Sequence, residues 1–307
     1  MKKIYAIIFA ILLLAPTVSF SQYSWNRFTN RNEYLLGFGA SQFLGDLGGS
    51  KTIGTHFLKD FNFGSIREAF ELGYRYHINP YFAAKFMLTG AYVHGEDRFS
   101  EEAYRHNRNL NFRSPIVELS AQYEYYFYRN STIGHRYHIK HAHGFQRFAA
   151  DAYIFIGFGA FWFNPQGQYV NGAWYNLRPL STEGEGLQNG PSKYLPLAIC
   201  VPIGIGFKYS INPQWNVGLE ISDRIWTSSD YIDDTHGTYY DNAAIKQDRG
   251  DIAAYFADPS LGEIQQAIPP NGTGQKRGDP NHNDTYMFTY ITVSYSPPFR
   301  RRTRSKF

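Results

Sequence analysis

Residues 117–128 read VELSAQYEYYFY, and their side chains alternate in character. One set of alternate positions is apolar or aromatic: Val117, Leu119, Ala121, Tyr123, Tyr125 and Phe127. The other set carries most of the polar groups: Glu118, Ser120, Gln122, Glu124, Tyr126 and Tyr128. Alternation with a period of two residues is typical of a β-strand, and strands of soluble proteins usually run to about five or six residues. A strand this long with one apolar face suits a bilayer, which β-strands cross in about 9–11 tilted residues.

Seven further segments show the same alternation. They lie near residues 33–41, 70–76, 82–92, 152–162, 199–209, 215–224 and 286–296. Together with the opening stretch they predict an all-β chain of eight strands, whose apolar positions face lipid and whose other positions face a lumen. A count of ten strands stays open, because one more hairpin fits inside residues 227–285.

The connections between these segments alternate between short and long. Residues 78–80 and 211–213 both read Ile-Asn-Pro, which fits a tight turn because Asn bonds the backbone and Pro fixes φ. The other connections are long: 42–67, 93–113, 164–194 and 227–285. Short turns on one rim and long loops on the other predict an antiparallel transmembrane outer-membrane β-barrel over residues 22–299, with extracellular loops and periplasmic termini. A soluble β-sandwich is the alternative, and the long strands and the aromatic residues at their ends argue against it.

The N-terminus predicts export of the chain. Two lysines precede a short apolar run, and small residues stand at Ser19 and Ser21. This is the pattern of a cleaved signal peptide, which we place at residues 1–21. The single cysteine, Cys200, excludes an intrachain disulfide, and its inward parity predicts a small packed residue. The formal net charge of +4 is too small to indicate a nucleic-acid partner.

The inward positions of the predicted strands carry nearly balanced charge. The acids and bases are Glu71, Arg75, Lys85, Glu118, Glu124, Asp151, Lys208, Glu220 and Arg224. An eight-stranded barrel is just wide enough for side chains to fill it, and an unpaired buried charge is costly. We therefore expect a filled lumen with an ion-pair network and no pore. Inward glycines such as Gly157 and Gly204 would leave room for bulky neighbours.

Two clusters resemble metal sites without matching one. His138, His141 and His143 have Arg136 and Lys140 as neighbours, and these cations would repel a metal ion. Several aspartates lie within 230–241, but their spacing does not fit a twelve-residue calcium loop. A solvated loop is the preferred interpretation there, and calcium stays open.

The sequence gives little sign of catalysis. Small membrane barrels include lipid hydrolases, and His94 and Ser100 are residues of the required types. Neither lies in a Gly-x-Ser-x-Gly stretch or a comparable arrangement. We expect a protein that is not an enzyme, with no catalytic residue, cofactor or small-molecule substrate.

Basic residues gather at the predicted periplasmic rim. They are Arg129, Arg136, Lys140 and Arg147 in one connection, and Arg300, Arg301, Arg302, Arg304 and Lys306 in the tail 300–307. Charge of this kind binds lipid headgroups or steers a protein partner. Because two separate basic segments share one rim, docking of a periplasmic partner is the favoured interpretation.

Four stretches are similar to a known family. They are GASQFLGDLGG (39–49), WYNLRPLSTEGEG (174–186), PIGIGFKY (202–209) and DYIDD (230–234). In this order they resemble the PorG-like outer-membrane barrels of Bacteroidota, from about Tyr34 to Tyr295. The motif residues that carry the resemblance are Gly45, Asp46, Gly48, Gly49, Thr182, Glu183, Gly184, Tyr231, Asp233 and Asp234. The chain departs from the family pattern at Ser181, Glu185 and Thr235-His236.

The resemblance implies a role in type IX protein secretion, which in some species also serves gliding motility. It implies a non-enzymatic outer-membrane component that docks a periplasmic ring made by a lipoprotein and its partner. A structural or adhesive surface barrel, binding an external ligand through its long loops, is the alternative. A lipid-acting enzyme is the third.

Overall fold

The computed structural model describes residues 31–45, 47, 63–99, 102–129, 150–212, 214–262 and 276–297. The expected signal peptide and the tail 300–307 lie outside these residues. So do 130–149, which hold most of the basic connection and all three histidines of the weighed metal cluster.

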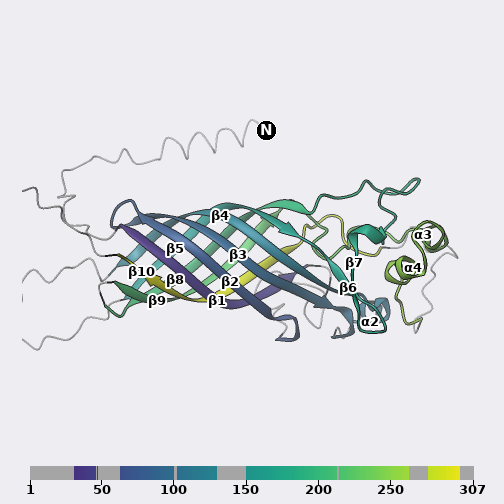
Figure 1. The fold of residues 1–307 in the computed structure, drawn as a ribbon, viewed down its shortest axis with the longest axis horizontal. Coiled ribbons are helices and arrows are strands. Elements are labelled where there is room, and N and C mark those ends of the chain that lie inside the picture. Colours follow the sequence, from purple (N-terminus) through teal and green to yellow (C-terminus); the bar gives the residue numbers. More distant parts are fainter. Residues whose placement is uncertain are drawn as a thin grey trace, which may run out of the picture.

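Eight long strands close into an antiparallel barrel within the described residues (Figure 1). They are β1 (Asn32–Leu44), β2 (Arg67–His77), β3 (Phe82–Glu96), β4 (Asn111–Arg129), β5 (Ala150–Phe163), β8 (Leu197–Ser210), β9 (Trp215–Thr227) and β10 (Thr285–Tyr295). Neighbours follow the order β3-β2-β1-β10-β9-β8-β5-β4, and pairing of β3 with β4 closes the ring. The predicted all-β, eight-stranded antiparallel barrel is confirmed.

Strand β4 contains the opening stretch, and its two faces are as the alternation predicts. Glu118 and Glu124 are fully buried in the lumen, whereas Leu119 on the outer face is 65% exposed. The prediction fails at Tyr128, which is 52% exposed rather than inward. The register with β5 shifts between Tyr126 and Tyr128, so Phe127 is an extra residue that moves Tyr128 to the outer face.

The outer surface of the barrel carries a continuous apolar belt. On β4 the belt runs from Val117 to Phe127, and both residues are exposed. Ten residue steps cover about 33 Å of strand, or roughly 25 Å along the barrel axis at a tilt of about 40°. The apolar band of transmembrane barrels is about 25 Å tall. An exposed apolar belt of this height is the surface of a barrel that spans a membrane.

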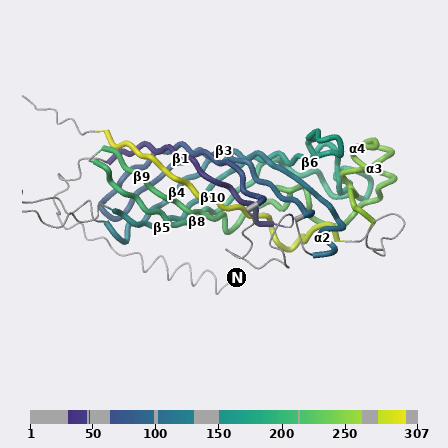
Figure 2. The backbone as a smooth tube through the Cα atoms, turned by 90° about the horizontal axis from the view of Figure 1, so that it is seen from below, coloured from purple at the N-terminus to yellow at the C-terminus, as the bar shows by residue number. Residues whose placement is uncertain are grey.

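Smaller elements gather beyond one end of the barrel, as Figure 2 shows. They are β6 (Gln166–Gln168), β7 (Trp174–Asn176), α2 (Ala103–Arg108), α3 (Asn242–Arg249), α4 (Asp251–Ala257) and the short 3₁₀ turns η3 (Phe63–Ser65), η4 (Asp97–Phe99) and η5 (Arg178–Leu180). We call the part formed by the described residues of the loops 97–110, 164–196 and 228–284 the cap.

Two expectations about the loops are corrected by these elements. The extra hairpin is β6–β7, in the connection after β5, whereas 227–285 holds α3 and α4 in its described part. The connection expected at 93–113 is shorter, because β3 continues to Glu96 and β4 already begins at Asn111.

No helix among the described residues is both long enough and apolar enough to cross a membrane.

The two short turns have the same structure and related sequences. In the turn from β2 to β3, the Asn79 side chain accepts hydrogen bonds from the backbone N–H groups of residues 81 and 82. In the turn from β8 to β9, Asn212 bonds residues 214 and 215 in the same way. The flanking sequences are LGYRYHINPYF (72–82) and IGFKYSINPQW (205–215).

The repeat extends to a second pair of strands. β1 contains GFGA at 37–40, and β5 contains GFGA at 157–160. The strand order places β1 opposite β5 and β2 opposite β8 around the ring. The two halves of the ring, β1–β4 and β5 with β8–β10, thus carry short sequence repeats at opposite positions.

Candidate functional site

The lumen near the short turns is filled by a network centred on Arg75. Its guanidinium lies 3.2 Å from Glu33, 2.7 Å from Glu124 and 3.0 Å from Glu220, measured between nitrogen and oxygen atoms. The same group donates to the Tyr153 hydroxyl at 3.0 Å. All five side chains are buried. A guanidinium with donors on several sides is suited to holding three carboxylates at once.

Two lysines complete this network. Lys85 Nζ lies 2.6 Å from a Glu220 oxygen and 3.4 Å from a Glu124 oxygen. Lys208 Nζ lies 3.2 Å from Glu33 and 4.0 Å from Asp151. Strands on opposite sides of the barrel are thus tied together across the lumen.

A second cluster lies closer to the cap. Arg224 donates from Nε and Nη2 to the two oxygens of Glu118, at 2.8 Å and 2.7 Å. The Tyr286 hydroxyl donates to the same carboxylate at 2.9 Å, and the guanidinium lies 4.1 Å from the Phe288 ring centre. The pair is bidentate and fully enclosed, the geometry in which Arg and carboxylate groups interact most strongly.

All nine charged residues predicted for the lumen are buried there, and eight of them form ion pairs. Of these nine residues, Glu71 has no cation within salt-bridge distance in the described part of the chain. Its side chain lies directly over Gly37, where a Cβ would approach Glu71 Cγ to 2.5 Å. The small inward glycine gives this carboxyl its space, as the sequence predicts for such glycines.

The sequence interpretation missed Glu33, which pairs with Arg75, His77 and Lys208. A signal was available, because Glu33 has the same parity as Gly37 and Gly39, two inward glycines on the same strand. It also missed the Tyr153 hydroxyl, which is a hydrogen-bond partner of Arg75 and Glu220.

An aromatic plug seals the cap-side end of the lumen. Its buried rings include Phe43, Phe112, Phe161, Phe163 and Tyr286, which pack with Cys200 in one cluster. Phe43 and Phe112 meet edge to face with ring centres 4.7 Å apart. Cys200 is buried, the small packed residue that the sequence predicts. Two ion-pair clusters and this plug leave the lumen suited to rigidity rather than to passage of solutes.

The cap is organised around a buried arginine, Arg277. Its guanidinium lies 3.1 Å from Glu183 and donates to the backbone carbonyl of Asp234 at 2.7 Å. Glu183 also accepts from the backbone N–H groups of His236 and Gly237, at 2.9 Å and 3.0 Å. This centre fastens the loop after β5 to the loop after β9.

Two of the family-like motifs, 174–186 and 230–234, meet at the same place. Asp234 accepts hydrogen bonds from Thr182 at 2.6 Å and from Tyr194 at 2.5 Å. Tyr231 stacks on Tyr194 with ring centres 4.4 Å apart. Gly184 has a φ of +79°, a left-handed conformation that favours glycine. Motifs far apart in sequence thus lock one loop to another.

The first motif is described in part. Gly45 lies against Asp284, whose Oδ1 would be 2.3 Å from a Cβ at that position. Asp46, Gly48 and Gly49 lie outside the described residues.

Burial changes the acidity of two cap carboxyls. It raises the pKa of Asp234 to about 6, against the opposing effect of Arg277. Burial, reinforced by the nearby Asp234 carboxylate, raises the pKa of Glu185 to about 8. The expectation of a solvated loop at 230–236 is therefore wrong for its aspartates: Asp230, Asp233 and Asp234 are all buried. The long loops fold over the barrel mouth, where backbone N–H groups and Arg277 replace water as their partners.

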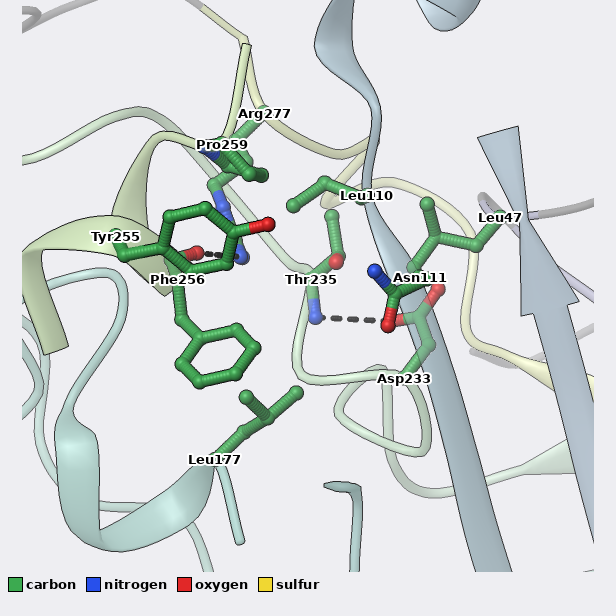
Figure 3. Close-up of a pocket in the computed structure, with 10 residues that line it drawn as sticks. All are labelled: Leu47, Leu110, Asn111, Leu177, Asp233, Thr235, Tyr255, Phe256, Pro259 and Arg277. Carbon is green, nitrogen blue, oxygen red and sulfur yellow. Dashed lines mark hydrogen bonds between the residues drawn. The ribbon is translucent and has the colours of Figure 1, made fainter. Parts of the chain in front are cut away.

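A small pocket lies beside Arg277 in the cap (Figure 3). Leu110, Leu177, Phe256 and Pro259 give it apolar walls, and Thr235 adds a polar one. Figure 3 also shows the hydrogen bond from the Thr235 backbone to Asp233, at 2.8 Å. No group of three or more metal-ligating side chains occurs among the residues that the structure describes.

The remaining candidate residues are only partly placed. Arg129 is turned inward, with its Nη1 2.6 Å from the Pro80 carbonyl and its Nε 3.6 Å from Asp151. Its guanidinium thus has partners within the barrel. His94 is buried and its Nδ1 lies 2.7 Å from the Phe112 carbonyl, while Ser100 is outside the described residues.

The fold is similar to several solved membrane barrels. Ail, the attachment invasion locus protein of Yersinia pestis, aligns with a TM-score of 0.37 and 8% identity, over 87% of this chain and 98% of Ail. Neisserial surface protein A gives 0.33 and 8%, over 87% and 97%. The N-terminal barrel domain of Pseudomonas aeruginosa OprF gives 0.31 and 8%, over 87% and 98%. At such scores the fold assignment rests on the strand pairing of this chain itself.

The sequence has no match among curated proteins. A family model described as a domain of unknown function, DUF6089, matches residues 7–250, which is most of the chain, and the protein therefore belongs to the DUF6089 family.

Proposed function

We propose that this chain is a non-enzymatic outer-membrane barrel that anchors a secretion complex and does not conduct solutes itself. The observation that carries the proposal is the closed lumen, in which Arg75 and Arg224 each bind carboxylates from other strands. An interior filled with paired charges leaves no path for solutes, and it holds the two ends of the barrel in a fixed shape. A docking function needs such rims.

The finer proposal is a component of the type IX secretion system. It is supported by the PorG-like motifs, two of which meet at the Thr182–Asp234 contact in the cap. In this role the short turns and both termini face the periplasm, and the basic segments 129–147 and 300–307 contact a ring-forming lipoprotein and its partner. Positive charge on one rim would speed and orient that docking.

The test is a crosslinked pull-down of the tagged chain from outer membranes. We expect a periplasmic lipoprotein to be recovered, and recovery to fall when residues 300–307 are deleted. Deletion with unchanged recovery removes the tail from the docking surface. Failure to recover any periplasmic lipoprotein with the intact chain overturns the secretion role.

A surface-binding role is the second candidate, and the ordered cap favours it. Arg277 and Glu183 hold two long loops in one arrangement, which presents a fixed surface outside the barrel. In this case deletion of residues 242–257, which form α3 and α4, would abolish attachment of cells to a ligand surface and leave secretion intact. The secretion role predicts that attachment is unaffected by that deletion.

A further inference from the structure

The outer face of β4 continues beyond the apolar belt as a polar surface. The belt ends at Val117, and Arg113 and Asn111 stand further along the same face. Four residue steps from Val117 place Arg113 about 13 Å along the strand, or roughly 10 Å above the belt at a tilt of about 40°. This height reaches the lipid headgroups, whose region adds about 5–7 Å to each side of a hydrocarbon core about 30 Å thick, slightly thicker than the belt is tall.

Side chains from β6 and β7 join this surface and are held in place by hydrogen bonds. Arg113 Nε donates to Gln166 Oε1 at 2.9 Å, and Gln166 Nε2 donates to Asn176 Oδ1 at 3.0 Å. Asn164 donates to the same Asn176 oxygen at 3.0 Å. The Arg113 guanidinium lies over Trp174, 4.1 Å from the ring centre. The surface is thus arranged before any ligand arrives.

We call this surface the amide face. It consists of Asn111, Arg113, Asn164, Gln166, Gln168, Trp174 and Asn176. None of these seven residues is buried, and none carries a negative charge. Arg113 is held by its Nε contact with Gln166 and by the Trp174 ring beneath its guanidinium.

These residue types suit a phosphorylated sugar. Side-chain amides both donate and accept hydrogen bonds, as sugar hydroxyls do, and an indole edge offers an apolar body beside them. An Arg fork matches phosphate in geometry and charge. The face is also continuous with the lipid-contacting belt on the same strand, so a ligand bound there would have its acyl chains beside Val117 and Leu119.

We propose that the amide face binds the phosphorylated saccharide headgroup of an outer-leaflet glycolipid. The inference rests on the orientation in the proposed function, with the cap outside the cell. It does not depend on the secretion role. The bound glycolipid would fix the depth and rotation of the barrel in the membrane and brace the β6–β7 hairpin.

The experiment measures binding of purified lipopolysaccharide to the detergent-folded chain, with phosphatidylglycerol as an anionic competitor without sugar. Arg113→Gln should lower the affinity about tenfold, the scale expected for one charge-assisted contact. Lys246→Gln is the control, because Lys246 is also exposed on the cap side but lies on α3, which Figure 1 shows farther from the barrel than β6 and β7. Its affinity should equal that of the unchanged protein. A gel-shift assay of heat modifiability confirms that each variant is folded.

Three results would overturn the proposal. The first is equal binding by Arg113→Gln and the unchanged chain. The second is equal loss in Lys246→Gln, which would mean that charge anywhere on the cap side suffices. The third is competition by phosphatidylglycerol as strong as that by lipopolysaccharide, which would exclude sugar recognition. Running both variants through the crosslinked pull-down separates the two proposals, since the docking partner is predicted on the opposite rim and its recovery should not change.

Discussion

Neutralising one member of the Glu118–Arg224 pair should destabilise the barrel strongly. Glu118→Gln keeps the side-chain shape but leaves Arg224 as a buried cation, 2% exposed, without its bidentate partner. Breaking a buried pair in this way costs about 3–5 kcal/mol. The double variant Glu118→Gln with Arg224→Met removes both charges and should cost less than the single change.

The assay is urea unfolding of the protein folded into lipid vesicles, followed by tryptophan fluorescence. The control is Glu96→Gln. Glu96 lies 2.8 Å from Nε of Arg98, and the Arg98 side chain is 61% exposed. Exposed pairs contribute about 0–1 kcal/mol, so this variant should unfold almost as the original does. A loss below about 1 kcal/mol for Glu118→Gln, or a double variant no more stable than the single one, would refute the reasoning. Planar-bilayer recordings should show no channel in any of these variants, because the Arg75 network and the aromatic plug remain.

Three further changes test other parts of the structure. Gly39→Ala would place a Cβ 1.9 Å from the Thr289 carbonyl oxygen and should cost about 3 kcal/mol in the same unfolding assay, whereas Gly90→Ala, with nothing within 4 Å, should be nearly neutral. Leu119→Arg should destabilise the folded barrel by about 2–4 kcal/mol if the residue lies near the midplane, and should therefore lower the yield of folded protein in vesicles. Normal assembly would mean that this face does not meet lipid. The raised pKa of Glu185, about 8 in the folded cap, makes the folded state bind more protons than the unfolded chain, so cap stability should fall as pH rises from about 4.5 to 8. Glu185→Gln should flatten that pH dependence in limited proteolysis of the cap, and an unchanged profile would assign the effect to other groups.

Much of the barrel could be predicted because the lipid outside and the polar lumen inside require opposite side-chain character at neighbouring positions. Leu119 and Glu118 differ by one position, and a one-residue shift would put the carboxylate into lipid. Alternation therefore specified both the strands and the lumen charges. It failed at Tyr128, because a bulge changes parity without leaving a mark in the sequence.

The cap was beyond such reasoning. Its contacts join Thr182 to Asp234 and Glu183 to Arg277, pairs separated by 52 and 94 residues. No periodic pattern relates residues across loops of that length, so their aspartates resembled ordinary solvated side chains. Partners of individual lumen charges were likewise hidden, because parity gives the face of a residue but not the strand across from it.

The two halves of the barrel differ in buried charge, which has a consequence for self-association. The first half contributes four buried carboxylates (Glu33, Glu71, Glu118 and Glu124) but only two buried cations, Arg75 and Lys85. The second half contributes two of each: Asp151 and Glu220, and Lys208 and Arg224. Cations of each half reach carboxylates of the other, as in Arg75–Glu220 and Lys208–Glu33. Two copies of the first half would enclose a large excess of negative charge. The two halves of the chain therefore complement each other in charge. This disfavours a barrel in which the first halves of two different molecules pair with each other.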